Sequence, residues 1–414
     1  MKMKISFYPE SFESGISRKE VKNKTVEFRM SMFSVWKSVI SDCRKRLVAG
    51  VPEIVRIKPI RIPKHSFFKQ VTIPRHPNLI LLSLLEPFHT GKMVTHAAVL
   101  PLKDTEIEPD DLLGVFEIQF IGTGIFKNLR SKKIPEIIGM AELTYLNLVF
   151  PEGKKLRLKV SNFEYRAGKM AYWLPIISKE SKEVERGKIE EIRIREINLP
   201  QKTIVKPLCG INHALGSVLA LLGDLKLVEE NRKVRKAIFM PLEDGRIEDG
   251  DLLGALNVYY LAGVSQFDFD REMKVMMSYK EDGEVKRVET KRTATGYLRS
   301  FSGSFTGIVA KETRSLRKGE PVLLKIRELI IPANAMPSLT IYPTHACGCV
   351  LDLRMKKPKR IEEEKKVEEV LFFPFFDCEI QADDFLGFLC VHELLCSWNA
   401  MEVKPEYLDR YLVE

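Results

Sequence analysis

The segment PLEDGRIEDGDLLG, at residues 241–254, is one of three similar segments in the chain. Its counterparts are PLKDTEIEPDDLLG at residues 101–114 and PFFDCEIQADDFLG at residues 374–387. A segment that recurs at long intervals marks a repeated structural unit, so other parts of the chain should recur with it.

Four landmark residues precede each copy of this segment, in the same order. They are an aromatic residue, a glycine fourteen positions later, a proline thirteen positions after the glycine, and a histidine thirteen positions after the proline. The three sets are Trp36, Gly50, Pro63 and His76; Trp173, Gly187, Pro200 and His213; and Phe305, Gly319, Pro332 and His345. The gapless spacing predicts three homologous units, at 1–136, 137–272 and 273–414. Since no Gly/Ser-rich or Pro-rich linker separates them, we expect them to pack directly on one another, as a pseudo-threefold ring or a linear array.

Alternating residue patterns predict an all-β fold. The segments EIVRIKPIRI (53–62), EIRIREINL (191–199) and LLKIRELII (323–331) place apolar residues on one face of a strand and charged residues on the other. We expect each unit to be a β-barrel or β-sandwich of about seven strands, with a hairpin of the kind that β-clip folds contain. Only ISRKEVKN (16–23) and KRIEEEKKVEEV (359–370) favour short helices.

The composition indicates an ordinary folded protein. The 414 residues are 45% hydrophobic and 29% charged, and the net charge is +10. The longest apolar runs fall well short of the roughly 20 residues that a membrane helix needs, and the N-terminus lacks the apolar core of a signal peptide. Seven cysteines with irregular spacing favour buried, reduced thiols, although His345, Cys347 and Cys349 in the third unit could alternatively form a zinc or redox site. We therefore expect a cytoplasmic protein without membrane contact.

The repeated segment also carries a family resemblance. Residues 101–114 and 241–254, and more loosely 374–387, resemble the archaeal domain of unknown function 22, which occurs in one to three copies per protein. The resemblance extends over nearly the whole chain and implies an archaeal source. It implies no activity, cofactor or catalytic residue.

Six aspartates in the repeated segments are better candidates for structural than for catalytic roles. They are Asp104, Asp111, Asp244, Asp251, Asp377 and Asp384. Aspartate favours turns because its carboxylate accepts hydrogen bonds from nearby backbone N–H groups.

The recurrent histidines His76, His213 and His345 are candidate metal ligands. In a pseudo-threefold ring they could meet on the axis, where three neutral imidazoles with an open fourth position would hold zinc or another divalent transition metal. Alternatively, each histidine could bind a ligand within its own unit or fix its own loop by hydrogen bonds.

Recurrent basic residues form a candidate anion-binding ladder on one strand face of each unit. They are Arg56 and Lys58, Arg193 and Arg195, and Lys325 and Arg327. Such a face could bind phosphates or acidic partners, or could be a solvated face that discourages edge pairing.

No nucleophile, nucleotide-binding or zinc-protease motif occurs in the sequence. We therefore expect a non-enzymatic binding or scaffold protein that contacts an unknown protein partner or an anionic ligand. A metal-dependent enzyme with a tri-histidine site is the alternative. Association with RNA or the ribosome is a weaker alternative.

Overall fold

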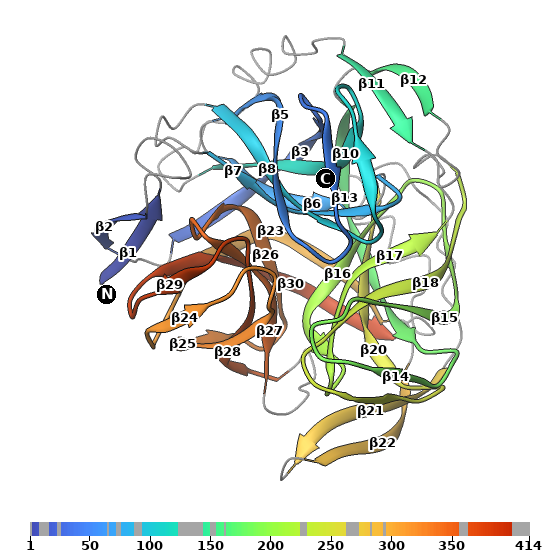
Figure 1. Ribbon diagram of the computed structural model, residues 1–414. Helices are drawn as coiled ribbons and strands as arrows, with labels where there is room; N and C mark the ends of the chain where they lie inside the picture. Colours follow the sequence, from blue (N-terminus) through green and yellow to red (C-terminus); the bar gives the residue numbers. More distant parts are fainter. Residues whose placement is uncertain are drawn as a thin grey trace.

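The structure, a computed structural model, describes most of the chain, and every regular element in the described residues is a β-strand (Figure 1). The described residues are 2–7, 16–22, 26–63, 66–71, 76–86, 93–122, 144–149, 155–160, 163–223, 230–261, 273–281, 284–292, 295–355 and 363–399. The expected all-β fold is confirmed. The two expected helices are wrong, because residues 17–22 form a strand, and so does the described part of 359–370 from residue 365 onward.

Each unit contains eight strands in the same order. In unit 1 they are β3 (Val26–Ile40), β4 (Lys45–Leu47), β5 (Glu53–Arg61), β6 (Ser66–Val71), β7 (Leu79–Leu85), β8 (Met93–Pro101), β9 (Thr105–Ile107) and β10 (Leu112–Gly122). In unit 2 they are β13 (Phe163–Ile177), β14 (Lys182–Val184), β15 (Glu190–Leu199), β16 (Thr203–Asn212), β17 (Gly216–Gly223), β18 (Arg232–Pro241), β19 (Gly245–Ile247) and β20 (Leu252–Leu261). In unit 3 they are β23 (Thr295–Val309), β24 (Arg314–Leu316), β25 (Val322–Ile331), β26 (Ala335–Thr344), β27 (Gly348–Arg354), β28 (Lys365–Pro374), β29 (Cys378–Ile380) and β30 (Phe385–Asn399).

The strands of a unit form two packed sheets and a short ribbon, not a closed barrel. In unit 1, β5, β8 and β7 form a three-stranded sheet, β4 pairs with β9, and β3, β10 and β6 belong to a larger shared sheet. Units 2 and 3 repeat this pairing. The alternation that predicts the strands is preserved in burial, since β15 places Ile192, Ile194 and Ile197 in the core of its unit and turns Arg193 and Arg195 outward.

The landmark glycines occupy turns that require a left-handed backbone. Gly50, Gly187 and Gly319 have φ angles of 74°, 76° and 77°. A side chain is disfavoured at such angles, so this position is glycine in every unit.

The three longest strands join the units into a ring. The first residues of β3, β13 and β23 each pair with the second half of another of these strands: Val26–Arg29 with Ser302–Phe305, Phe163–Arg166 with Phe33–Trp36, and Thr295–Leu298 with Met170–Trp173. All three pairings are antiparallel and relate equivalent segments. The units therefore surround a pseudo-threefold axis, and the linear array is excluded.

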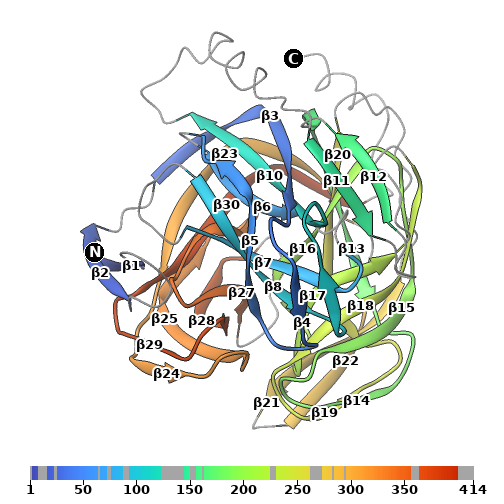
Figure 2. The same ribbon diagram turned by 45° about the horizontal axis from the view of Figure 1, so that its top comes forward.

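Three hairpins lie outside the eight-strand units and complete the ring. They are β1–β2 (Lys2–Phe7 and Ser17–Lys22), β11–β12 (Thr144–Val149 and Lys155–Val160) and β21–β22 (Met273–Glu281 and Glu284–Arg292). Each precedes one unit in the sequence but contacts another. Hairpin β21–β22 bonds to unit 2 through Met276 and Gly250, whereas β1–β2 bonds to unit 3 through Lys4 and Asp383 (Figure 2). The first residues of the chain thus contact its last unit.

An apolar cluster at the axis is shared by all three units. It includes Ile80 and Leu100 of unit 1, Ile238 of unit 2, and Phe373 and Phe375 of unit 3. Apart from Phe375, which directly follows β28, these residues lie on the three-stranded sheets, on the faces that point away from each unit's own core. Strand β7 is therefore buried on both faces, which explains why its sequence LILLSLL does not alternate.

We predict that a chain starting at residue 23 opens selectively at unit 3. Without β1–β2, the backbone at 345–348 and 381–384 loses its contacts with that hairpin, whereas the equivalent backbone of unit 2 keeps its contacts with β21–β22. Hydrogen exchange measures this directly, with 213–216 as the internal control. Equal loss of protection in the two segments would contradict the packing of hairpin β1–β2 on unit 3.

Candidate functional site

In units 2 and 3, the landmark histidine lies beside the second aspartate of the repeated segment. In unit 2, His213 Nε2 is 3.1 Å from Asp251 Oδ2, and both side chains are fully buried. In unit 3, His345 Nε2 is 3.3 Å from Asp384 Oδ2. In each case Nδ1 accepts a hydrogen bond from the backbone N–H two residues later, at Leu215 and Cys347 respectively. An accepting Nδ1 places the proton of a neutral imidazole on Nε2, which donates it to the aspartate.

His76 of unit 1 has the same local geometry. It is buried, and its Nδ1 accepts a hydrogen bond from the backbone N–H of Asn78 at 3.2 Å. The backbone N–H of His76 donates to the backbone carbonyl of Leu113. In Asp111, Asp251 and Asp384, the carboxylate also accepts a backbone N–H bond from three residues earlier. The expected turn role of these aspartates is confirmed.

An arginine from a hairpin reaches this turn in each unit. Arg287 Nε donates to Asp251 at 3.0 Å, and Arg18 Nε donates to Asp384 at 2.9 Å. The equivalent Arg157 lies 3.5 Å from Asp110, the neighbour of Asp111. We call each such group a clasp: a histidine and aspartate of one unit with the arginine of the hairpin packed on that unit.

The clasps give each histidine a structural role in its own unit. Among the residues that the structure describes, which include all three histidines, no group of three or more His, Cys, Asp or Glu side chains could hold a metal ion. His76, His213 and His345 are therefore not brought together as ligands. The prediction of a tri-histidine centre did not take into account that, in units 2 and 3, the imidazole bonds to the aspartate of the repeated segment.

Burial and hydrogen bonding shift the pKa values of the clasp residues. Burial disfavours the imidazolium form and lowers the pKa of His213 and His345, although their aspartate partners oppose this shift. For Asp251 and Asp384, burial alone would raise the pKa. Hydrogen bonds from the histidine, the arginine and the backbone outweigh burial and lower the pKa of both carboxyls. The clasp thus joins a neutral imidazole, a carboxylate and a guanidinium.

The basic ladder lies on the outer strand faces, and ion pairs occupy most of it. Arg56 pairs with Asp42 and Lys58 with Asp110, and Arg193 pairs with Glu180 at 2.6 Å. Lys325 lies 4.0 Å from Glu312, and Arg327 pairs with Asp383. Arg195 lies exposed beside Gly250. These carboxylates offset the positive charge that would attract an anion to this face.

A polar group that is buried except for the half-buried Ser338 surrounds the pseudo-threefold axis, and none of its residues was predicted as a site from the sequence. It consists of three equivalent positions in each unit, on strands of the shared sheet. We call these nine residues the axial cluster: Lys69, Glu117 and Gln119; Lys206, Asn257 and Tyr259; and Ser338, Cys390 and His392.

Strand pairing brings these positions together. Lys69 lies opposite Glu117, Lys206 opposite Asn257, and Ser338 opposite Cys390. On the other side of Asn257 and Cys390 lie Trp173 and Phe305, the aromatic landmarks of units 2 and 3. The aromatic recurrence in the sequence therefore marks the strand that borders the axis.

Contacts made by axial-cluster residues cross all three interfaces. Lys206 donates to Glu117 of unit 1, and Lys69 Nζ is 2.6 Å from His392 Nε2 of unit 3. Asn257 Nδ2 lies 2.7 Å from the sulfur of Met336. Because an ammonium group can only donate, His392 Nε2 is the acceptor and the proton of this neutral ring is on Nδ1. Cys390 Sγ is 3.2 Å from the same nitrogen.

In the sequence, this cluster is marked only by fixed distances from the landmark residues. Lys69, Lys206 and Ser338 lie six residues after the landmark prolines, and Glu117, Asn257 and Cys390 lie three residues after the last glycine of the repeated segment. Because the residue types differ between units, a search for recurring identities does not find them.

Two cysteines of unit 3 form a disulfide, which corrects the expectation of reduced thiols. Cys347 and Cys378 are bonded, with their Cα atoms 6.5 Å apart, whereas Cys43, Cys209, Cys349 and Cys390 are not disulfide-bonded. The bonded pair is 31 residues apart in sequence. The spacing pattern gave no indication of it, because the contact depends on how β29 packs beside the loop after β26.

Comparisons with known proteins show a family relationship without an activity. The family described as "Domain of unknown function DUF22" matches residues 2–105, 143–245 and 274–378, which make up well over half of the chain. The uncharacterized protein MJ0614 of Methanocaldococcus jannaschii is 30% identical over 83 residues, which are 20% of this chain. The chain spans only 64% of the length of that relative. No solved structure matches the chain.

We predict that Arg18→Gln lowers the free energy of unfolding by about 3 kcal/mol, because it leaves the Asp384 carboxylate buried without its charged partner. The Arg18 side chain is 19% exposed and that of Asp384 is 0% exposed. Arg44→Gln is the matched control, since Arg44 and Glu106 form an exposed pair and its loss costs less than about 1 kcal/mol. Urea denaturation measures both. Equal effects would refute a special contribution of the clasp.

We also predict that acid destabilises the clasps in two steps. The lowered histidine pKa means that the unfolded chain binds protons first, so stability falls as the pH drops below about 6.5. The lowered aspartate pKa adds a further loss as the unfolded carboxyls titrate near pH 4. Unfolding free energy against pH measures this. The double variant His213→Gln/His345→Gln should flatten the first step, and an unchanged profile would contradict the assignment.

Proposed function

Because the chain belongs to the family of domain of unknown function DUF22, whose description assigns no activity, we propose from its own residues that it is a non-enzymatic binding protein. The proposed ligand is a small anion, a phosphate or a carboxylate, held at the axial cluster. This keeps the anionic ligand expected from the sequence but moves its site from the ladder to the axis.

The observation that supports this proposal is the charge of the axial cluster. Lys69 and Lys206 are buried with one carboxylate, Glu117, between them: Lys69 lies directly opposite Glu117 on the neighbouring strand, and Lys206 bonds to it. The ammonium group of Lys206 therefore contacts this carboxylate, whereas that of Lys69 contacts His392 Nε2. Among its nine residues, the cluster itself therefore carries two cations and one anion.

Retaining this charge in the interior has a cost. Desolvation of a buried charge amounts to several kcal/mol, and apolar side chains of similar volume are often at least as stable. An anion from solution that binds beside the two lysines would offset their charge. Asn257, Ser338 and the neighbouring hydroxyl of Tyr259 add neutral hydrogen-bonding groups.

The other functions expected from the sequence have less support. A tri-histidine enzyme would need the imidazoles that the clasps already occupy. Association with RNA would need an unneutralised basic face, whereas the ladder is largely paired with carboxylates. Among the described residues, no helix is long and apolar enough to cross a membrane. A cytoplasmic location and an archaeal source are part of the proposal.

The test titrates inorganic phosphate, acetate, malonate and citrate into the full-length protein by calorimetry. At least one anion should bind, and Lys69→Met and the charge-matched double variant Lys206→Met/Glu117→Gln should each weaken binding at least about tenfold. The ladder variant Arg193→Gln/Arg195→Gln is the control and should leave affinity unchanged. Binding of none of these anions, or a loss confined to the ladder variant, would refute the proposal.

A further inference from the structure

The disulfide of unit 3 joins two segments that adjoin in the fold whether or not they are bonded. The equivalent positions in unit 2 are Leu215 and Gly245. A Cβ atom added to Gly245 would lie 2.8 Å from Leu215 Cδ1, so these two positions are in contact there as well. In unit 3 both positions are cysteine, which turns a packing contact into a covalent one.

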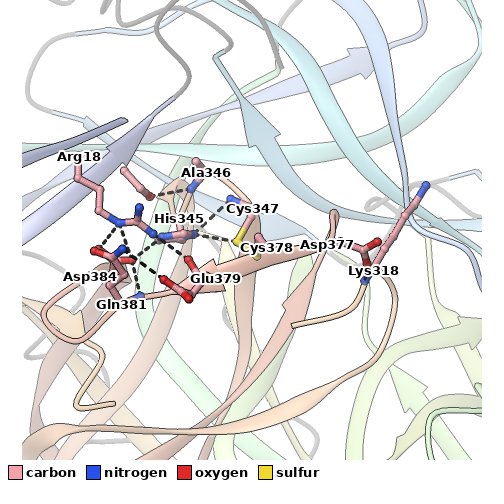
Figure 3. Close-up of a disulfide and its surroundings, with 11 residues drawn as sticks. Arg18, Lys318, His345, Ala346, Cys347, Asp377, Cys378, Glu379, Gln381 and Asp384 are labelled. Carbon is pink, nitrogen blue, oxygen red and sulfur yellow. Dashed lines mark hydrogen bonds and ion pairs between the residues drawn. A yellow bond between two sulfur atoms is a disulfide. The ribbon is translucent and has the colours of Figure 1, made fainter. Parts of the chain in front are cut away.

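The bonded cysteines lie on the two segments that hold the N-terminal hairpin. Cys347 belongs to the loop of His345 and Ala346, and Ala346 N donates to Ser6 Oγ of β1 at 3.0 Å. Cys378 begins β29, where the next residue, Glu379, accepts a hydrogen bond from Arg18 Nη2 at 2.8 Å. Figure 3 shows the disulfide beside the clasp formed by Arg18, His345 and Asp384.

The two cysteines differ in exposure. Cys347 is fully buried, whereas Cys378 is half-buried. A thiolate from solution can therefore attack Cys378 first, and Cys347 is then the leaving group within the protein. With a dithiol reductant the exchange balances: the reductant gives up two electrons and two protons and forms its own disulfide, while Cys347 and Cys378 become thiols.

Reduction acts on the clasp through His345. Its Nδ1 accepts the backbone N–H of Cys347 at 3.2 Å and also lies 3.2 Å from Cys347 Sγ. Once reduced, the thiol can donate its proton to this nitrogen and compete with the backbone for it. Loss of the covalent bond also frees β29 from the loop that holds β1.

We propose that the Cys347–Cys378 pair is a reversible redox site that controls how firmly the N-terminal hairpin closes the ring. The oxidised form holds the His345 loop and β29 together around the hairpin. The reduced form leaves only the hydrogen bonds and the ion pair of the clasp. Neither of the other clasps has this pair, because units 1 and 2 have Asn78 with Thr105 and Leu215 with Gly245 at these positions.

Hydrogen exchange of the oxidised and dithiothreitol-reduced full-length protein tests the proposal. Intact mass after alkylation first verifies the bond in the oxidised sample. Reduction should raise exchange in residues 2–7 and 17–22 by about tenfold through local opening, with little change in 273–281 and 284–292, which hold the same position on unit 2.

Variants separate the bond from other effects of the reductant. Cys378→Ser and Cys347→Leu/Cys378→Gly, the latter with the residues of unit 2, should exchange at the fast rate in both conditions. Cys209→Ser is the control and should keep the response. Alkylation of all seven cysteines without reductant, or equal exchange of the N-terminal hairpin in both states, would overturn the proposal.

Discussion

The mutual pairing of the three long strands is the constraint on which the architecture depends. Each of β3, β13 and β23 is 15 residues long and pairs with the other two. A strand that pairs with two others of its kind cannot satisfy its backbone groups within one unit. The units therefore have to come together around an axis, and the apolar faces of their three-stranded sheets become buried there. On the outside of the ring, each hairpin likewise contacts a unit other than the one that follows it in the sequence.

Much of the single unit could be predicted from local chemistry. The alternation in segments such as EIRIREINL predicts a half-buried strand, and the landmark Gly187 marks a turn with positive φ. The aspartates were assigned to turns because their carboxylates bond to nearby backbone, and they do. These features depend on neighbours within a few residues or on one sheet.

Features that depend on contacts between distant segments could not be predicted. The local pattern of ISRKEVKN favours a helix. The segment is a strand because it pairs with β1 and contacts unit 3, which the sequence does not show. The pairing of His345 with Asp384 joins residues 39 positions apart, and the axial cluster joins three units. Recurrence identified the histidines, but their partners decide their role, because the Asp384 carboxylate makes the imidazole a hydrogen-bond donor within the core.

Fusion of the units into one chain has a consequence at the axis. A ring of three identical chains must place the same residue three times at each axial position, so a buried lysine there would bring two further lysines with it. In the fused chain the equivalents of Lys69 are Lys206 and Ser338, and those of Glu117 are Asn257 and Cys390. Symmetric packing is kept while the chemistry at the axis becomes asymmetric. The protein can therefore present one carboxylate, one thiol and one imidazole in a place where symmetry alone would allow only triplets.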